Sequence, residues 1–157
     1  MPGTDVEIRE ATSDDAERLA GVYRSAYAHN RKIGFPASAE SATRSEVVEW
    51  ITAHTVFVAV AESAVVGGVR LTEPEPARGK ISRFGVHEDW KGRGIGGELL
   101  AHVEEVCRNR GYDSVRLTTP GDHPFLPGFY RSRGYEKTGD YPLDYRDYDE
   151  IVMAKQL

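Results

Sequence analysis

The sequence predicts a mixed α/β fold, in which one central twisted sheet carries helices on both faces. With 157 residues, the chain has the length of a single domain, 1–157, that can bury its own core. Short segments with strand periodicity alternate with longer segments of helical periodicity. In the middle of the chain, a glycine-rich stretch joins an apolar strand to an amphipathic helix. This order indicates antiparallel hairpins before the glycines and a crossover helix after them.

The N-terminal part of the chain predicts one strand and two helices. Residues 6–9 alternate in polarity, and the hydroxyls and acids of residues 12–15 are typical of a helix start. Helical spacing continues to residues 28–30 through Ala16, Leu19, Tyr23, Ala26 and Tyr27. Residues 29–39 contain a glycine and a proline and predict a loop. A second helix is expected over residues 44–54.

The rest of the chain predicts further strands and two more helices. Strands are expected over residues 55–61, 64–71, 81–86, 113–119 and 150–155. Helices are expected from Ile95 to Gly111 and, as a short one, over 128–133. Loops are expected at residues 73–76, 120–127 and 141–147. The Gly67-Gly68 pair inside the third strand predicts a bulge or a close approach of another backbone.

Composition excludes several classes of protein. The net charge of −5 and the pI of about 5.6 argue against a surface that binds nucleic acid. No apolar run is long enough to span a membrane, and residues 1–9 lack the apolar core of a secretory signal. The single cysteine, Cys107, allows no internal disulfide, and we expect it to be buried. The composition therefore predicts a cytoplasmic protein.

The glycine-rich stretch predicts an anion site. Four glycines fall between positions 92 and 97, directly before a helix. Glycines let backbone N–H groups approach an anion closely, and the helix adds free N–H groups and the positive end of its dipole. Together they predict a cradle for phosphate or pyrophosphate. A plain tight turn is the alternative interpretation of the same glycines.

Two nucleotide-binding motifs do not match this cradle. Gly92, Gly94 and Gly97 spell GxGxxG, but five residues separate them from the strand, and no acid stands near Leu117–Thr119. A P-loop requires Lys and then Ser or Thr after its last glycine, where this chain has Glu98 and Leu99. A nucleotide-binding module remains an alternative of low support.

A third pattern matches better. Residues 83–100 resemble the acetyl-CoA-binding motif of the GCN5-related N-acetyltransferases, the GNAT family. Lys91, Gly94 and Gly96 stand where that family has Arg or Gln, Gly, and Gly or Ala. Downstream, Phe129–Tyr135 resembles the family's second signature, an aromatic-Tyr pair followed by Gly-aromatic. The two motifs occur in the family's order and spacing, and the resemblance covers essentially the whole chain.

The resemblance implies a GNAT-like fold with a mostly antiparallel sheet, in which the strand before the cradle and the next strand splay apart as a V. It implies an acetyl-CoA-dependent N-acetyltransferase that transfers acetyl directly to a primary amine of a small molecule or a peptide. A non-catalytic acyl-CoA-binding or sensing domain is the alternative function. A homodimer is common in the family. No metal ligand is predicted.

The resemblance also implies site residues. The Phe84–Val86 backbone would pair with the pantetheine arm, and one of its N–H groups would face the thioester oxygen. His123 stands near the position of a family residue that contacts this arm. Tyr130 would protonate the leaving thiolate. The expected cofactor-binding residues are Phe84, Gly85, Val86, Lys91, Gly92, Arg93, Gly94, Ile95, Gly96, Gly97 and His123.

The general base and the acceptor are left open by the sequence. Lys80 stands where the family often has a Glu base, so the base could be water or a side chain among His87, Glu73, Glu75, Asp122 and His123. Acceptor selection is expected from loops 29–39 and 141–150. The second loop is rich in tyrosines and acids, which suits a cationic amine, whereas Arg31 and Lys32 in the first favour the opposite charge.

Overall fold

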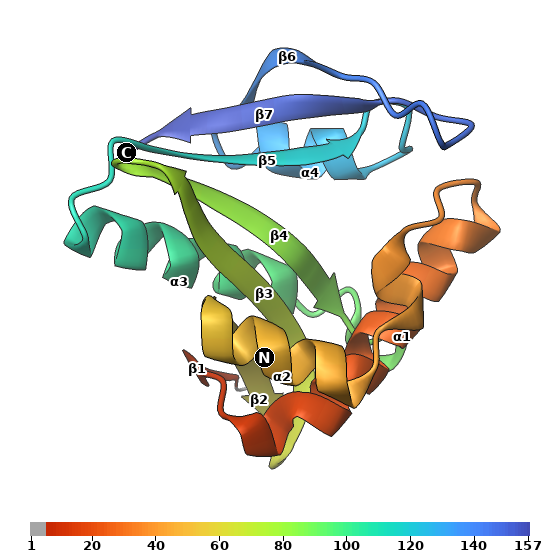
Figure 1. Ribbon diagram of the computed structural model, residues 1–157, viewed down its shortest axis with the longest axis vertical. Helices are drawn as coiled ribbons and strands as arrows, with labels where there is room; N and C mark the ends of the chain where they lie inside the picture. Colours follow the sequence, from red (N-terminus) through yellow and green to blue (C-terminus); the bar gives the residue numbers. More distant parts are fainter. Residues whose placement is uncertain (1–5) are drawn as a thin grey trace.

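Seven strands form one sheet in the computed structural model, which describes residues 6–157 (Figure 1). The strand order is β1-β2-β3-β4-β5-β7-β6, and every neighbouring pair is antiparallel except β4 and β5. The strands are β1 (Glu7–Glu10), β2 (Thr55–Ala61), β3 (Ala64–Glu75), β4 (Arg78–Val86), β5 (Ser114–Pro120), β6 (Glu136–Tyr141) and β7 (Glu150–Gln156). The helices are α1 (Ala16–Lys32), α2 (Arg44–Ala53), α3 (Ile95–Asn109) and α4 (Leu126–Arg131).

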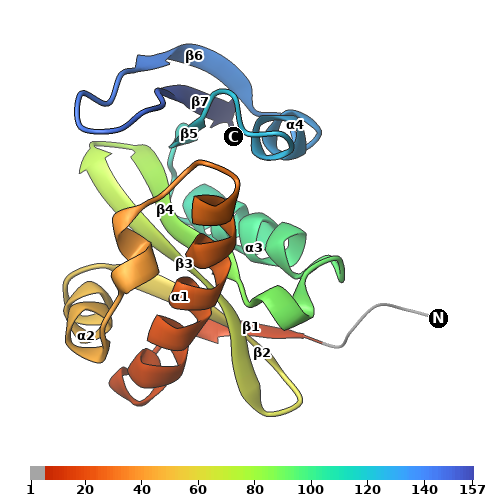
Figure 2. The ribbon, with the colours of Figure 1, turned by 90° about the vertical axis from the view of Figure 1, so that its right-hand side faces the viewer.

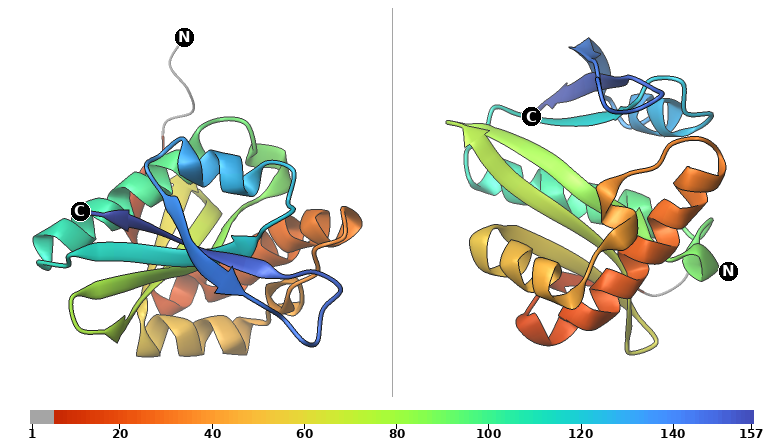
Figure 3. Two further views of the ribbon diagram at one scale, coloured as in Figure 1. Left: turned by 90° about the horizontal axis from the view of Figure 1, so that it is seen from above. Right: turned by 45° about the vertical axis from the view of Figure 1, so that its right-hand side comes forward.

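Helices cover both faces of the sheet, as predicted (Figures 2 and 3). On one face, α1 and α2 pack on β2 through a core that includes Leu19, Tyr23 and Val47. On the other face, α3 packs on β2–β4 through a larger core that includes Leu99 and Val103. Both cores follow from the apolar stripe that each helix sequence carries at helical spacing.

The sheet opens between β4 and β5. These two parallel strands pair only at Arg78–Lys80, opposite Ser114–Arg116. Beyond Lys80 they diverge, while β5 stays paired with β7 over its whole length (Figure 1). The V-shaped splay that the family resemblance implies is therefore present, and the β5-facing edge of β4 is free of strand pairing beyond Lys80 within the described residues.

A bulge shapes β4 beside this opening. Gly68 pairs with Gly85 and Arg70 with Ser82, so Arg83 and Phe84 together face the single residue Val69. Arg83 adopts φ of +48°, a left-handed backbone conformation that is uncommon for residues other than glycine. The close approach predicted at Gly68 is also present, because a Cβ there would lie 2.4 Å from Leu19 Cδ1 of α1.

Several predicted boundaries were wrong. Residues 73–75 of the expected loop belong to β3, and the turn begins at Pro76. The strand tolerates Pro74 because this residue lies beyond the part of β3 that pairs with β2. Helix α1 continues to Lys32, past its predicted end. A strand at 136–141 was not predicted, since β6 is a largely exposed edge strand without apolar alternation. No helix within residues 6–157 is long and apolar enough to cross a bilayer.

Candidate active site

A cavity of about 560 Å³ fills the opening between β4 and β5. Its walls come from both diverging strands, from α1, from the N-terminal end of α3, from α4 and from the segment between β6 and β7. Every predicted site residue lines it except Arg93 and His123. Segments far apart in the sequence therefore build one site around the splay.

The phosphate cradle, Lys91–Gly97, forms the floor at the start of α3. Gly92 and Gly94 adopt φ of +77° and +81°, and no atom lies within 4 Å of where their Cβ atoms would be. Gly94 is the N-cap of α3, and no side chain of the described residues caps this helix start. The first N–H groups of α3 thus have no partner within the helix and suit an anion.

Positive side chains flank the cradle. A Cβ on Gly97 would lie 2.4 Å from the Arg133 guanidinium, so this glycine leaves room for an arginine from the turn after α4. The Arg133 guanidinium also lies 4.7 Å from the Phe129 ring centroid. Arg93 instead lies over the Trp90 ring, at 4.6 Å. Lys91 and Arg133 are therefore the cations that face the cavity beside the cradle.

Tyr130 of α4 lies in the wall next to β4. Its side chain is buried, with 5% exposed, and packs on Phe84 with the ring centroids 6.3 Å apart. Burial raises the pKa of the Tyr130 hydroxyl, and the neighbouring Tyr27 and Glu150 raise it further. The hydroxyl therefore stays protonated near neutral pH and can donate a hydrogen bond into the cavity.

Glu150, the first residue of β7, also lines the cavity. The strand pairs it with Pro120 of β5 and Tyr141 of β6, which places it at the open end of the splay. Burial raises the pKa of its carboxyl, and the nearby Thr118 hydroxyl, Lys80 and Arg146 partly oppose this effect. A carboxylate with a raised pKa inside a cleft is suited to accept a proton.

Comparison with known proteins identifies the family that uses this arrangement. A family model described as the acetyltransferase (GNAT) family matches residues 19–135, well over half of the chain. The chain belongs to the GNAT family of acetyltransferases. The cradle and the Phe129–Tyr135 signature both lie inside the matched range.

Relatives of this GNAT protein are N-acetyltransferases. The S-(2-succino)cysteine N-acetyltransferase of Bacillus subtilis (strain 168) is 29% identical and covers 95% of this chain and 94% of its own. The S-alkylcysteine N-acetyltransferase of the same organism is 28% identical, and the match covers 82% of this chain and 78% of the relative. The PaiA N-acetyltransferase of Thermoplasma acidophilum, in complex with coenzyme A, shares the fold with a TM-score of 0.83 at 19% identity, over 98% and 99%. The protein is thus an N-acetyltransferase with acetyl-CoA as co-substrate.

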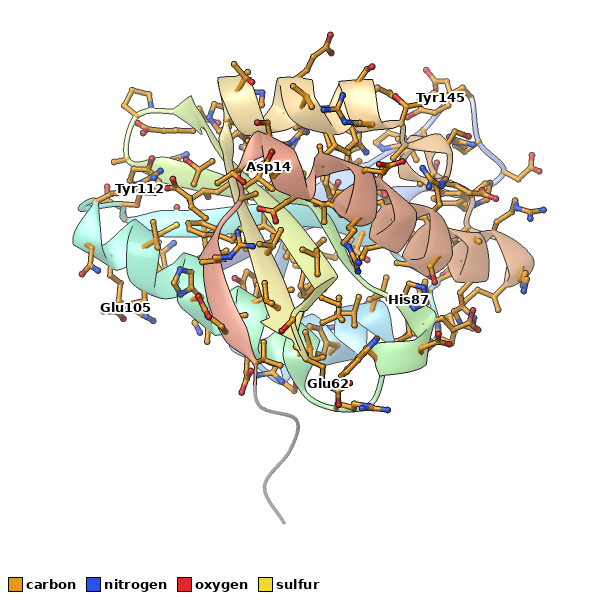
Figure 4. All side chains as sticks on the ribbon, turned by 90° about the horizontal axis from the view of Figure 1, so that it is seen from below. Asp14, Glu62, His87, Glu105, Tyr112 and Tyr145 are labelled. Atoms are coloured by element: carbon orange, nitrogen blue, oxygen red, sulfur yellow. The ribbon has the colours of Figure 1, made fainter. Side chains whose placement is uncertain are left out.

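Glu150 is a carboxylate in the cavity wall that the sequence interpretation did not consider as a base for this GNAT enzyme. Glu73 instead accepts a hydrogen bond from the Tyr112 hydroxyl at 2.6 Å, and His87 Nδ1 accepts the Asp89 N–H. Figure 4 shows Tyr112 and His87 at opposite ends of the molecule. Glu75 pairs with Arg116 at 2.9 Å. Among the described residues, none of these candidates lines the cavity, and neither does Asp122.

His123 has a structural position in this enzyme. Its ring is buried, and Nδ1 accepts the N–H groups of Phe125 and Leu126 at 3.3 and 3.2 Å, at the start of α4. Nε2 therefore carries the proton and donates it to Asn30 Oδ1 at 3.1 Å. Both nitrogens are occupied, and the ring is not among the described residues that line the cavity. Its predicted contact with the cofactor stays a prediction.

Acidification should destabilise the enzyme through His123. Burial, together with the nearby charges of His29 and Lys91, lowers the pKa of this imidazole to about 4. The unfolded chain binds the proton near pH 6.5, so stability is present above pH 6.5 and falls as the pH drops toward 4, by about 3 kcal/mol in total. Urea unfolding between pH 7 and 4 measures this slope, and His123→Asn should flatten it. An unchanged slope in the variant would contradict the assignment.

The two predicted acceptor loops meet over the cavity. The Tyr148 hydroxyl donates to the Pro36 carbonyl oxygen at 2.5 Å, and the Tyr148 and Phe35 rings meet edge to face at 5.1 Å. Of the acids in the second loop, only Glu150 lines the cavity within the described residues. The other acidic side chains of this loop therefore face the solvent, and the neighbouring Asp140 pairs with Lys137.

Proposed function

We propose that this enzyme acetylates the α-amino group of a small amino acid, with S-substituted cysteines as the first acceptors to test. The observation that carries the proposal is that one cavity holds the phosphate cradle, Tyr130 and Glu150 together. Two relatives that are similar over most of the chain are named for S-substituted cysteines. The contact between the acceptor loops through Tyr148 and Pro36 limits the space over the cavity, which favours a small acceptor over a folded protein.

Acetyl-CoA supplies the activated acetyl thioester, and the chain supplies the means to hold it. The free N–H groups at the start of α3 would bind the pyrophosphate, with Lys91 and Arg133 adding positive charge. The open edge of β4 at Phe84–Val86 would bind the pantetheine arm as a neighbouring strand does. Tyr27 donates to the Phe84 carbonyl oxygen at 3.2 Å and so fixes the backbone at the bulge.

The acceptor amine must be neutral when it attacks. An α-amino group with an ordinary pKa of about 8 costs roughly 1–2 kcal/mol to present neutral at pH 7. We assign the removal of this proton to the Glu150 carboxylate. The neutral amine nitrogen then forms the new bond to the acetyl carbon, the carbon–sulfur bond breaks, and the thiolate of coenzyme A leaves. The nitrogen releases its second proton to water, through which it reaches the thiolate.

Tyr130 would assist this departure. Its raised pKa makes complete proton transfer to a thiolate of pKa about 8.5 unfavourable, so its contribution is a hydrogen bond to the developing charge on sulfur. Water then supplies the proton for the free thiol. This assignment modifies the role of a full proton donor that the resemblance implies.

The proposal is tested by acceptor specificity. Release of coenzyme A from acetyl-CoA should be measured with S-methylcysteine, S-(2-succino)cysteine and a lysine-containing peptide at equal concentrations. We expect turnover with the cysteine derivatives and little with the peptide. Turnover of the peptide alone would contradict the amino-acid acceptor, and tight acetyl-CoA binding without turnover of any amine would favour the non-catalytic alternative.

We also propose that the enzyme acts in the cytoplasm and on small molecules rather than on nucleic acid. The net charge of −5 supports this proposal. Cys107 is buried in α3, and burial raises the pKa of its thiol to about 11, which suits an inert core position. Assembly into a homodimer stays a prediction.

A further inference from the structure

The charges around the cavity do not fit a simple amine. Four cationic side chains and one carboxylate line it: Lys91, Arg133, Arg83, Arg146 and Glu150. Lys91 and Arg133 belong to the cradle. Arg83 and Arg146 are left outside the cradle, and Arg146 lies close enough to Glu150 to lower the pKa of its carboxyl. A protonated amine that enters the cavity outside the cradle meets two positive charges for one negative charge.

Arg83 has unusual backbone geometry. It lies in the β4 bulge with φ of +48°, a strained conformation that is concentrated at functional sites. Its Nε is buried and has no hydrogen-bond partner within residues 6–157. Its guanidinium lies over the Trp50 ring, 5.1 Å from the ring centroid. This contact uses the flat face of the guanidinium, so the N–H groups along its edge stay available for hydrogen bonds.

A second arginine reinforces the positive charge. Arg70 of β3 lies 5.5 Å from the same Trp50 ring, and its Nε donates to the Ser82 hydroxyl at 3.0 Å. Burial lowers the pKa of Arg70, and the proximity of Arg83 lowers it further. Ser82 itself lines the cavity. Two guanidinium groups thus lie against one aromatic ring, and of their two residues only Arg83 lines the cavity.

Some arginines elsewhere in the chain have acidic partners. Arg9 pairs with Asp15 at 2.8 Å, and Arg116 pairs with Glu75 at 2.9 Å. In the part of the chain that the structure describes, neither Arg70 nor Arg83 forms an ion pair with a carboxylate. Partly buried like charges without an acid repel each other, and a carboxylate from outside would relieve this repulsion.

We propose that Arg83, supported by Arg70 through Ser82, binds the carboxylate of the acceptor while its amine faces Glu150. The proposal rests on the proposed amino-acid acetyltransferase function and names the group that the site selects. A guanidinium presents a planar fork of donors that matches a carboxylate, and the carboxylate offsets the excess positive charge. The enzyme should therefore discriminate against amines that lack this acid group.

The test pairs one variant with one change in the substrate. Wild type and Arg83→Gln are assayed with S-methylcysteine and with S-methylcysteamine, which lacks the carboxylate. We expect wild type to prefer S-methylcysteine in kcat/KM by about tenfold or more. Arg83→Gln should lose about tenfold on S-methylcysteine and less than about twofold on S-methylcysteamine. Arg83→Lys, which keeps the charge, should recover part of the loss.

Controls separate carboxylate binding from structural damage. Arg78→Gln alters an exposed arginine at the other end of β4, where Arg78 pairs with Glu75 at 3.4 Å. This variant should leave kcat/KM unchanged for both substrates. The acetyl-CoA affinity and melting temperature of Arg83→Gln should match wild type. Equal losses on both substrates, or no wild-type preference between them, would overturn the carboxylate site but leave the proposed function. Turnover of neither substrate, with turnover of a lysine peptide, would overturn both.

Discussion

Glu150→Gln is expected to lower kcat/KM for an amino-acid acceptor by about a hundredfold at neutral pH, because the amide cannot accept the proton of the amine. The side chain keeps its shape, so the acetyl-CoA affinity should change little. Because Glu150 must be deprotonated to act, wild-type activity should fall as the pH drops through its pKa, which burial raises above the usual range. In the variant, this fall in activity at low pH should be absent. Its activity should instead increase as the pH rises and the amine itself loses its proton.

Two glutamates offer matched controls for this prediction. Glu73 and Glu75 lie on β3 outside the cavity, paired with Tyr112 and Arg116 respectively. Glu73→Gln and Glu75→Gln should therefore leave turnover within about twofold of wild type. A large loss of turnover in either control, together with a wild-type pH profile in Glu150→Gln, would show that Glu150 is not the base.

The cradle and the family were predictable because their signals are local. The glycines of positions 92–97 lie within one turn of the helix that they precede, and positive φ at Gly92 and Gly94 excludes most other residues. The apolar spacing of α3 and the strong β-propensity of β2 likewise depend only on neighbours in the sequence. The splay, in contrast, was predicted from the family resemblance, since strand periodicity does not indicate which strands diverge.

The proposed base and the proposed carboxylate site were not predictable from the sequence because both depend on long-range pairing. Glu150 follows a run of outward-facing acids, and only its pairing with Pro120 and Tyr141 brings it into the cavity. Arg83 reaches its position through a bulge opposite Val69, for which its own residue type gives no signal. The hydrogen bonds of His123 were likewise not predictable: its ring accepts the N–H groups of Phe125 and Leu126 at the start of α4, while its predicted contact with the cofactor stays a prediction.

Tyr130→Phe is expected to lower kcat by well over tenfold and to leave acetyl-CoA affinity within about twofold of wild type. Its hydroxyl makes no hydrogen bond to another described residue, so its removal should cost little stability, while the packing of the ring on Phe84 is kept. The loss falls on kcat because the proposed hydrogen bond to sulfur strengthens only as negative charge develops there. Steady-state kinetics together with calorimetric titration of acetyl-CoA would measure both quantities.

Tyr135→Phe supplies the opposite pattern and so makes the Tyr130 result interpretable. The Tyr135 hydroxyl donates to Glu104 at 2.9 Å inside the α3 core, and Lys155 also pairs with Glu104 at 2.9 Å. Its removal leaves a buried carboxylate short of one partner and should lower the free energy of unfolding by about 1–3 kcal/mol. Turnover of the folded fraction should stay near wild type. If Tyr130→Phe instead behaved like Tyr135→Phe, with lost stability and normal kcat, Tyr130 would be a core residue and the departing thiolate would depend on water alone.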